Sequence, residues 1–221
     1  MGIEDFIITV AEEKHTIFAE AICKEMEESA KARGTGIAKR DPEYIKAKMR
    51  EGKAIIALPK DQSRFAGFCY IESWGHDKFV ANSGLIVAPE FRNIGLAKEI
   101  KKKAFELSRK KFPKAKLFGL TTSLAVMKIN SELGYKPVSF SELTDDEEFW
   151  KGCSSCVNYD ILTRTNKKHC LCTGMLYDPS EKHVEQNKWD FKKNFEKFQK
   201  LLKIKESILF KFFTKTEVIK K

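Results

Sequence analysis

Residues 84–97 have the sequence Gly-Leu-Ile-Val-Ala-Pro-Glu-Phe-Arg-Asn-Ile-Gly-Leu-Ala, in which an apolar, strand-forming run leads into a turn and the start of a helix. Pro89 ends the strand, and Gly95 gives the turn a residue without a Cβ just before the helix. The first amides of a helix have no partner within it, so this joint can hold an anion such as a phosphate. Many strand–turn–helix joints bind no ligand, and the pattern alone leaves both interpretations open.

The turn in this segment resembles a known signature. Arg92-x-x-Gly95-x-Ala97 is similar to the (Arg/Gln)-x-x-Gly-x-(Gly/Ala) motif of the GNAT superfamily of acyl-CoA-dependent N-acyltransferases. Residues 133–135 (Leu-Gly-Tyr) resemble the family's Leu-Gly-Phe ending, and the resemblance covers roughly residues 5–140. It implies acetyl-CoA or another short acyl-CoA as cofactor, with the pyrophosphate on the turn amides and the pantetheine arm along the preceding strand. The implied cofactor-binding residues are Ile86, Val87, Arg92, Asn93, Ile94, Gly95, Leu96 and Ala97.

The composition fits one medium-sized domain with an extension. The chain has 221 residues, of which 42% are hydrophobic and 17 are Phe, enough for a sizeable core. No apolar run approaches the ~20 residues that a membrane span needs. Residues 1–5 lack the basic-then-apolar pattern of a secretion signal. We therefore predict a cytoplasmic protein, in which the six cysteines are thiols or metal ligands rather than disulfides.

Positive charge gathers in the C-terminal tail. Residues 180–221 contain 12 Lys and 6 Asp or Glu, and so supply +6 of the formal net charge of +10. Such a segment suits nucleic acid or an anionic surface, but it also suits a protein that binds a polyphosphate cofactor and carries a solvated basic helix. We favour the second interpretation because the sequence has no nucleic-acid motif with interleaved aromatic residues.

Periodicity and turn residues predict an element order of β-α-α-β-β-β-α-β-α-β. Asp41 and Pro42 are typical of a helix N-cap and first turn. On the helix at 94–111, apolar residues lie on one side, and the row of lysines on the other is expected to be solvated. The expected elements are strands at 7–10, 53–58, 65–74, 79–88, 116–121 and 135–140, and helices at 12–32, 41–52, 94–111 and 123–133.

The predicted fold class is α/β (α+β), with a GNAT-like mixed, mostly antiparallel central sheet flanked by helices. We place the N-acyltransferase domain at residues 1–165, including a short acidic helix at 145–150 and a strand at 157–162. Residues 166–221 are expected to form a Cys-containing segment and a basic amphipathic helix from Val184 onward. This helix is expected to pack on the domain or on a partner subunit of a homodimer, and a membrane-surface helix is the alternative.

Acyl transfer to an amine needs a base for the amine, a donor for the developing oxyanion and an acid for the leaving thiolate. The strand of the opening segment offers a backbone amide near Ile86 or Val87 for the oxyanion. That strand carries no carboxylate, so Glu72, His76 or a water must be considered as the base. In many family members a Tyr four residues before the glycine of the Leu-Gly-Phe motif is the acid. This chain has Asn130 there, and a carboxamide cannot supply a proton usefully near neutral pH.

Two further segments resemble one branch of the family, the single-domain enzymes that make N-acetylglutamate for arginine synthesis. Residues 35–43 (TGIAKRDPE) are similar to its Gly-Ile-x-x-(Lys/Arg)-Arg-Ser-x-Glu motif, and residues 117–122 (LFGLTT) to its Leu-Phe-x-Leu-Thr-Thr. The resemblance implies that Arg40, Thr121 and Thr122 bind the acceptor, and a guanidinium suits a carboxylate. The alternatives are a surface arginine neutralised by nearby acids, and threonines that only form a strand. The branch's aromatic pair is absent, so another amino acid or a polyamine stays open as the acceptor.

Four cysteines form two close pairs, Cys153-x2-Cys156 and Cys170-x-Cys172. Two such pairs can close a tetrahedral zinc site, with His169 as a substitute ligand. The second spacing is tighter than the usual two-residue gap and demands a bent backbone. We predict structural zinc, with free buried thiols and a redox or disulfide pair as the alternatives.

The sequence favours an acyl-CoA-dependent N-acyltransferase that acts on a small-molecule amine, with glutamate as the acceptor that the branch resemblance implies. A GNAT-like module that binds CoA or docks a partner without turnover is the second interpretation, because Asn130 stands where a catalytic Tyr is expected. A nucleic-acid-binding protein stabilised by zinc is the third interpretation, and it predicts that the affinity for DNA or RNA depends strongly on salt. Turnover of acyl-CoA distinguishes the first interpretation from the second.

Overall fold

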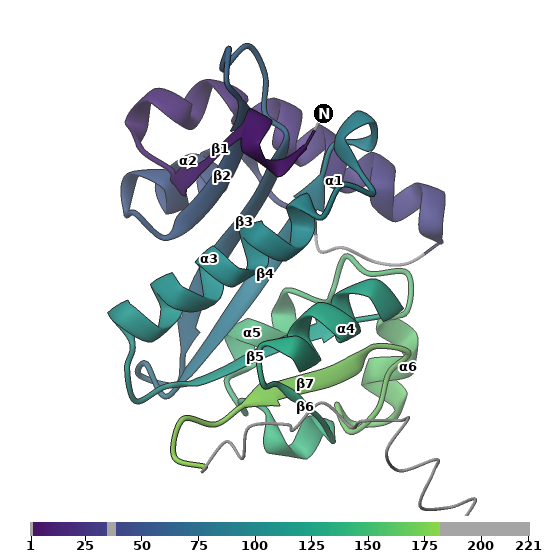
Figure 1. The fold of residues 1–221 in the computed structure, drawn as a ribbon. Coiled ribbons are helices and arrows are strands. Elements are labelled where there is room, and N and C mark those ends of the chain that lie inside the picture. The colour runs from purple at the N-terminus through teal and green to yellow at the C-terminus, as the bar shows by residue number, and fades with distance from the viewer. Residues whose placement is uncertain (1, 35–38, 182–221) are drawn as a thin grey trace, which may run out of the picture. The chain divides into compact units, whose positions relative to one another are not determined.

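The computed structural model describes residues 2–34 and 39–181, which form a seven-stranded sheet flanked by helices (Figure 1). The strands are β1 (Phe6–Val10), β2 (Ala54–Pro59), β3 (Gly67–Trp74), β4 (Phe79–Val87), β5 (Lys116–Thr121), β6 (Lys136–Val138) and β7 (Thr173–Tyr177). Their order is β1-β2-β3-β4-β5-β7-β6, and every neighbouring pair is antiparallel except β4 and β5, which run parallel. The predicted mixed, mostly antiparallel sheet is confirmed.

Helices cover both faces of this sheet (Figure 1). One face carries α3 (Leu96–Lys111) and α4 (Leu124–Glu132), and a Cβ built at Gly67 on that face would meet Ile100 of α3. The opposite face carries α1 (Ala19–Arg33), α2 (Pro42–Arg50), α5 (Glu147–Lys151) and α6 (Tyr159–Arg164). Single 3-10 segments lie at Ile3–Asp5 (η1), Glu13–Phe18 (η2), Pro89–Phe91 (η3) and Phe140–Glu142 (η4).

Local signals explain where several helices begin. Asp41 accepts a hydrogen bond from the Glu43 amide at 2.7 Å and Pro42 takes the first position of α2, so the predicted N-cap is confirmed. Ser123 caps α4 by accepting from the Val126 amide at 3.4 Å. The helix expected at 12–32 starts with the 3-10 segment η2, and only then continues as α1.

The structure corrects the predicted elements after β6. Residues 157–162 were expected to be a strand, but α6 begins at Tyr159 and turns Leu162 into the core. The sequence analysis assigned no element to β7, which lies between β5 and β6 in the sheet. The compact unit therefore extends to Glu181, beyond the domain end expected at residue 165. The helix expected from Val184, with its homodimer contact, lies outside the described residues.

The core consists of three packed clusters of apolar side chains. The largest joins β1–β4 to α1, α2 and α3. A second lies between β5, β7 and the α5–α6 segment, and a third lies under α3 around Tyr135. Within the described ranges, no helix combines the length and the apolar character that crossing a membrane requires.

The sheet opens between β4 and β5. These strands pair only at their beginnings, Phe79–Ala81 against Lys116–Phe118, and then diverge (Figure 1). A β-bulge lies at the same place, because Gly84 and Leu85 together oppose the single residue Cys69 of β3. Gly84 has φ +63°, and a Cβ there would lie 2.5 Å from the Tyr70 ring. Glycine is therefore required where β4 bends away from β5.

Candidate active site

A cavity of about 280 Å³ opens where β4 and β5 diverge. Residues 81–85 line it from β4, and residues 119–123 line it from the end of β5. It reaches both faces of the sheet, since Lys101 and Asn130 line it on the α3–α4 face, while Glu72 and other groups line it on the opposite face. Side chains on opposite sides of the sheet therefore face one continuous space.

The turn between β4 and α3 adjoins this opening and has the shape of an anion site. Asn93 and Gly95 both adopt left-handed backbone conformations, with φ of 66° and 88°, and Gly95 is the N-cap of the 16-residue α3. The first amides of α3 have no partner within the helix. A Cβ at Gly95 would approach nothing closer than 3.8 Å, so its conformation, not crowding, calls for glycine.

The Arg92 side chain stabilises this turn through hydrogen bonds to β4 and α1. Its Nε donates to the carbonyl of Val87 at 3.0 Å. Its Nη2 donates to Glu25 Oε1 at 2.9 Å and to Ser29 Oγ at 2.8 Å, both on α1. Arg92 thus ties the end of β4 and the turn to α1, so the groups of this turn that could bind an anion are its backbone amides.

Strand geometry distinguishes the two amides predicted for the oxyanion. The Ala88 amide donates to the Ala66 carbonyl at 2.9 Å, so it points toward the β3 side. Successive amides of a strand point to opposite edges, which turns the Ile86 amide toward β3 as well and the Val87 amide toward the diverging β5 side. The geometry therefore favours Val87 as the amide that faces the opening.

Glu72 of β3 is the buried carboxylate of the cavity, with 5% of its surface exposed. The Tyr44 hydroxyl of α2 donates to its Oε1, and the Ser83 side chain of β4 hydrogen-bonds to it as well. Burial raises the pKa of Glu72 above its ordinary value, and the nearby Arg40 and the bond from Ser83 offset only part of that rise. Glu72 therefore has the burial and the raised pKa typical of a general base.

Arg40 lies beside Glu72, in the loop just before α2. Its Nε donates to the Tyr70 hydroxyl at 2.7 Å, and its guanidinium stacks 5.6 Å from the centre of the Tyr44 ring. Its Nη2 donates no hydrogen bond to any residue that the structure describes. A Cβ at Gly152 would lie 3.7 Å from this Nη2, so α5 approaches the guanidinium closely. Its Nη1 donates to the Lys39 carbonyl at 3.4 Å, so Arg40 is held in place and Nη2 is the nitrogen left to donate to an anionic group.

The other predicted site residues have different positions. Thr121 and Thr122 both line the cavity, and Thr121 Oγ1 also accepts from the Ser123 amide at 3.0 Å. His76 lies in the exposed turn between β3 and β4, with φ of 55°, and is not among the cavity residues. His76 is therefore placed away from the cavity, which leaves Glu72 as the side-chain candidate for the base.

Solved structures share this architecture at low sequence identity. N-acetylglutamate synthase from Neisseria gonorrhoeae, complexed with coenzyme A and N-acetyl-glutamate, matches with a TM-score of 0.56 and 14% identity over 80% of this chain. The protein Rv2747 from Mycobacterium tuberculosis, in complex with CoA, matches with a TM-score of 0.55 and 14% identity over 78% of this chain. An acetyltransferase of the GNAT family from Staphylococcus aureus matches with a TM-score of 0.54 and 10% identity over 79% of this chain. This chain has the GNAT fold.

The extent of these matches differs. This chain spans 35% of the length of the Neisseria protein, 98% of the Mycobacterium protein and 99% of the Staphylococcus protein. No protein-family model and no curated protein matches the sequence. Identities of 10–14% establish the fold, and the chemistry must be argued from this chain's own residues.

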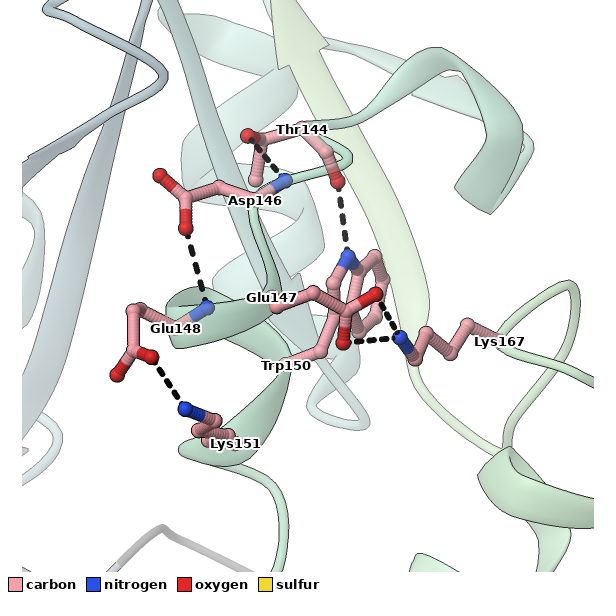
Figure 2. Close-up of polar contacts among 7 residues, drawn as sticks. All are labelled: Thr144, Asp146, Glu147, Glu148, Trp150, Lys151 and Lys167. Atoms are coloured by element: carbon pink, nitrogen blue, oxygen red, sulfur yellow. Dashed lines mark hydrogen bonds and ion pairs between the residues drawn. The ribbon is translucent and has the colours of Figure 1, made fainter.

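On this GNAT fold the α5–α6 segment forms a wall of the cavity that sequence reasoning did not anticipate. Asp146 caps α5 by accepting from the Glu148 amide at 3.0 Å (Figure 2). Its other oxygen accepts from the Gly75 amide at 3.0 Å. The Trp150 indole donates to the Thr144 carbonyl at 2.8 Å (Figure 2). These bonds fix the segment to the β3–β4 turn and the core, beside Arg40.

The four cysteines belong to this wall, and all of them line the cavity as free thiols. Burial raises the pKa of Cys153 to about 11 and that of Cys172 to about 12, and the neighbouring thiols add to both shifts. Among the described residues, however, no set of three or more His, Cys, Asp or Glu side chains is arranged to hold a metal ion. The structure therefore gives the predicted zinc site no support.

Two buried polar atoms at the cavity have no partner. Within the described chain, three buried side-chain nitrogen or oxygen atoms make no hydrogen bond: Trp74 Nε1, Asn130 Oδ1 and Arg109 Nη1. The first two belong to residues that line the cavity. An unpaired buried donor and an unpaired buried acceptor are each energetically costly.

One lysine departs from the prediction of a solvated row on the third helix. Lys101 is only 2% exposed and lines the cavity from α3, whereas Lys102 and Lys103 are exposed. The prediction placed all the lysines of this helix on the solvated side. Lys101, however, comes four residues after Ala97 and three before Ala104, so helical spacing puts it on their side of the helix, unlike Lys102 and Lys103.

Proposed function

We propose that this protein transfers an acyl group from acyl-CoA to the amine of a small molecule. The observation that carries the proposal is the cavity between the diverging β4 and β5, which adjoins an anion-binding turn and contains the buried carboxylate of Glu72. The GNAT fold and the CoA bound in two of its structural neighbours support an acyl-CoA as one substrate.

The residues fit such a substrate in three places. The amides of residues 93–97 at the start of α3 would bind the pyrophosphate. The edge of β4 that β5 leaves unpaired would hydrogen-bond to the pantetheine arm. The Val87 amide at that edge would stabilise the negative charge that develops on the thioester oxygen.

Glu72 would act as the general base. An amine attacks the thioester only as a neutral nucleophile, so a proton must leave the nitrogen before or during attack. Glu72 is unprotonated at pH values above its raised pKa and lies on the face of the sheet that also carries Arg40. The base and the acceptor site are therefore next to each other.

We propose an amino acid as the class of acceptor, with glutamate as the first candidate. Arg40 would donate to a carboxylate from Nη2, and the guanidinium is fixed by Tyr70, by the Lys39 carbonyl and by stacking on Tyr44. Thr121 and Thr122 line the cavity from the end of β5 and would add hydroxyl contacts. The Neisseria structure, which is complexed with N-acetyl-glutamate, agrees with this choice.

A CoA-binding module without turnover is the second candidate, and Asn130 in place of an acid is the observation that favours it. The two candidates are distinguished by incubating the protein with acetyl-CoA or succinyl-CoA and a panel of amino acids and polyamines. N-acylation of one or more amino acids is expected. CoA binding without any acylated product would support the module and contradict the enzyme.

A further inference from the structure

Lys101 occupies a place where a lysine is costly. It lies in the middle of α3 on the helix face that packs on the sheet, next to Ile100 and one turn from Ala104, both fully buried. Its own exposed surface is 2%. A buried ammonium is unfavourable unless a partner or a ligand compensates for the loss of water. An apolar residue would serve the packing of α3 better.

The residues around Lys101 do not compensate for this burial. No hydrogen bond or ion pair of its Nζ is found among the described residues. The ammonium lies 5.4 Å from the centre of the Tyr135 ring, and the Cys69 thiol of β3 also faces it. The polar groups nearby pair with each other: the Tyr135 hydroxyl donates to Asn82 Oδ1 at 2.9 Å, and Asn82 Nδ2 donates to Ser108 Oγ at 2.8 Å. Lys101 itself is one of the residues that line the cavity.

Asn130 of α4 faces the same cavity from the same side of the sheet. It is 1% exposed, and its Oδ1 is one of the buried atoms without a partner. Its amide has no proton to give at neutral pH, and burial holds the pKa of Tyr135 well above its ordinary value. Burial also raises the pKa of Cys69 to about 11. On this face, Lys101 is the cavity residue that can lose a proton near neutral pH.

We propose that Lys101 is the general acid that protonates the leaving CoA thiolate. The inference rests on the proposed acyl transfer and gives that reaction the proton donor that Asn130 cannot be. The amine nitrogen forms a bond to the thioester carbon, and its proton passes to Glu72. The carbon–sulfur bond breaks with both electrons on sulfur, and the sulfur takes a proton from the Lys101 ammonium. The products are the N-acyl amine and CoA thiol, and exchange of protons with water restores Glu72 and Lys101.

The acidity of Lys101 suits this step. Burial lowers its pKa from the ordinary value to about 8. A simple thiol has a pKa of about 8.5, so transfer from Lys101 to the thiolate is nearly balanced in free energy. An ordinary lysine, with a pKa of about 10.4, would be a weaker acid toward the same thiolate.

The test compares Lys101→Met and Lys101→Arg with Lys102→Met, a matched control on the exposed side of the same helix. Steady-state kcat is measured from pH 6 to 10 with acetyl-CoA and the best amine from the panel. Loss of a general acid is expected to lower kcat by about 100-fold or more, with the KM for acetyl-CoA changed far less. Arginine keeps the charge but cannot release its proton, so Lys101→Arg should be as slow as Lys101→Met. The wild-type kcat should fall at alkaline pH as Lys101 loses its proton, and the fall should be absent in both variants.

Lys101→Met removes an unpaired buried charge, so its melting temperature should equal or exceed that of the wild type. This result separates a catalytic loss from a folding defect. A kcat within twofold of the wild type in Lys101→Met, full activity in Lys101→Arg, or an unchanged alkaline limb in both variants would overturn the proposal. Absence of turnover in the wild type would instead refute the proposed function, so the two failures are distinguishable.

Discussion

Glu72 owes its chemical character to its neighbours. It lies on β3 facing α2, where burial disfavours the carboxylate while Tyr44, Ser83 and Arg40 supply hydrogen bonds and positive charge. Burial is the larger effect, so the pKa stays above its ordinary value. A carboxylate with a raised pKa is a better proton acceptor than an exposed one.

Glu72→Gln should therefore lower kcat by about 100-fold or more, because the amide cannot accept the proton of the amine. The sign of the pH effect follows from the raised pKa. The wild-type rate should fall as pH decreases through that pKa and Glu72 becomes protonated, and the variant should lack this acidic limb. Profiles of kcat against pH test both points, with the exposed Glu106→Gln as the control. An active Glu72→Gln enzyme would leave a water as the base.

Arg40 allows a test of the acceptor class. Arg40→Lys keeps the positive charge but removes the guanidinium, and Lys39→Ala is its neighbouring control, because only Arg40 donates to Tyr70 and has Nη2 near Gly152. If it binds a carboxylate, Arg40→Lys should raise the KM for an amino acid about tenfold or more, since one charge-assisted hydrogen bond contributes ~1.5–3 kcal/mol. The KM for acetyl-CoA should be unchanged. Equal effects on an amino acid and on a polyamine would argue against a carboxylate at Arg40.

At the same scale, sequence reasoning proposed Arg40 and Arg92 from motif resemblances, and Glu72 because the strand of the opening segment carries no carboxylate. It missed Lys101, which lies in a run of three lysines. It also assigned Arg92 to the cofactor, whereas its guanidinium holds the turn to α1. Local pattern shows which residues can do chemistry, but the packing of α3 and α1 decides what each side chain faces.

Among the elements, the bulged strand β4 carries the opening of the sheet. Gly84→Ala should destabilise the protein by about 1–3 kcal/mol, because φ is +63° and the new methyl would lie 2.5 Å from the Tyr70 ring. Gly119→Ala on β5 is the matched control, since a Cβ there has no neighbour closer than 4.0 Å. Urea unfolding of both variants measures the difference. Equal stability of the two would mean that β4 does not need the bulge.

The elements α6 and β7 show where sequence patterns are insufficient to predict secondary structure. The order from β1 to α4 could be predicted because helix caps, turn residues and long periodic runs agree there. Residues 157–162 suit a strand by composition, yet Thr163 and Thr165 bond back to the carbonyls of Tyr159 and Ile161 within α6, at 3.0 and 2.8 Å. Strand β7 is only five residues long, and its pairing with β5 and β6 depends on segments distant in sequence.

At the scale of the whole molecule, the cavity forms where residues from separate segments of the chain come together. Arg40 comes from the loop before α2, and Glu72, Lys101 and Asn130 come from β3, α3 and α4, while the cysteine-bearing segment closes one side. No local stretch of sequence contains this arrangement, which is why the cavity wall formed by residues 147–172 could not be predicted. The cysteine spacing suggested a metal, but the described thiols are not arranged to bind one.

Ligand binding gives a prediction at this scale. CoA at 100 times its Kd should stabilise the folded protein by ~2.7 kcal/mol, which corresponds to a rise in melting temperature of about 5–10 °C for a chain of this size. Pantetheine, which lacks the pyrophosphate, should give a smaller rise because it leaves the turn before α3 unoccupied. Thermal unfolding monitored by circular dichroism measures both shifts. Equal shifts with CoA and pantetheine would contradict a phosphate site at that turn.

The central claim is that the opening between β4 and β5 is the site of acyl transfer to an amine. Mass spectrometry of the products is the most direct test, because free thiols on the protein would interfere with colorimetric detection of CoA. Wild-type protein with acetyl-CoA and an amino-acid panel, glutamate included, should yield an N-acetyl amino acid and free CoA, and Glu72→Gln should yield at most about 1% of that rate. No acylated amine from the wild type with acetyl-CoA or succinyl-CoA would contradict the claim, and equal product from Glu72→Gln would contradict the role of Glu72 as the base.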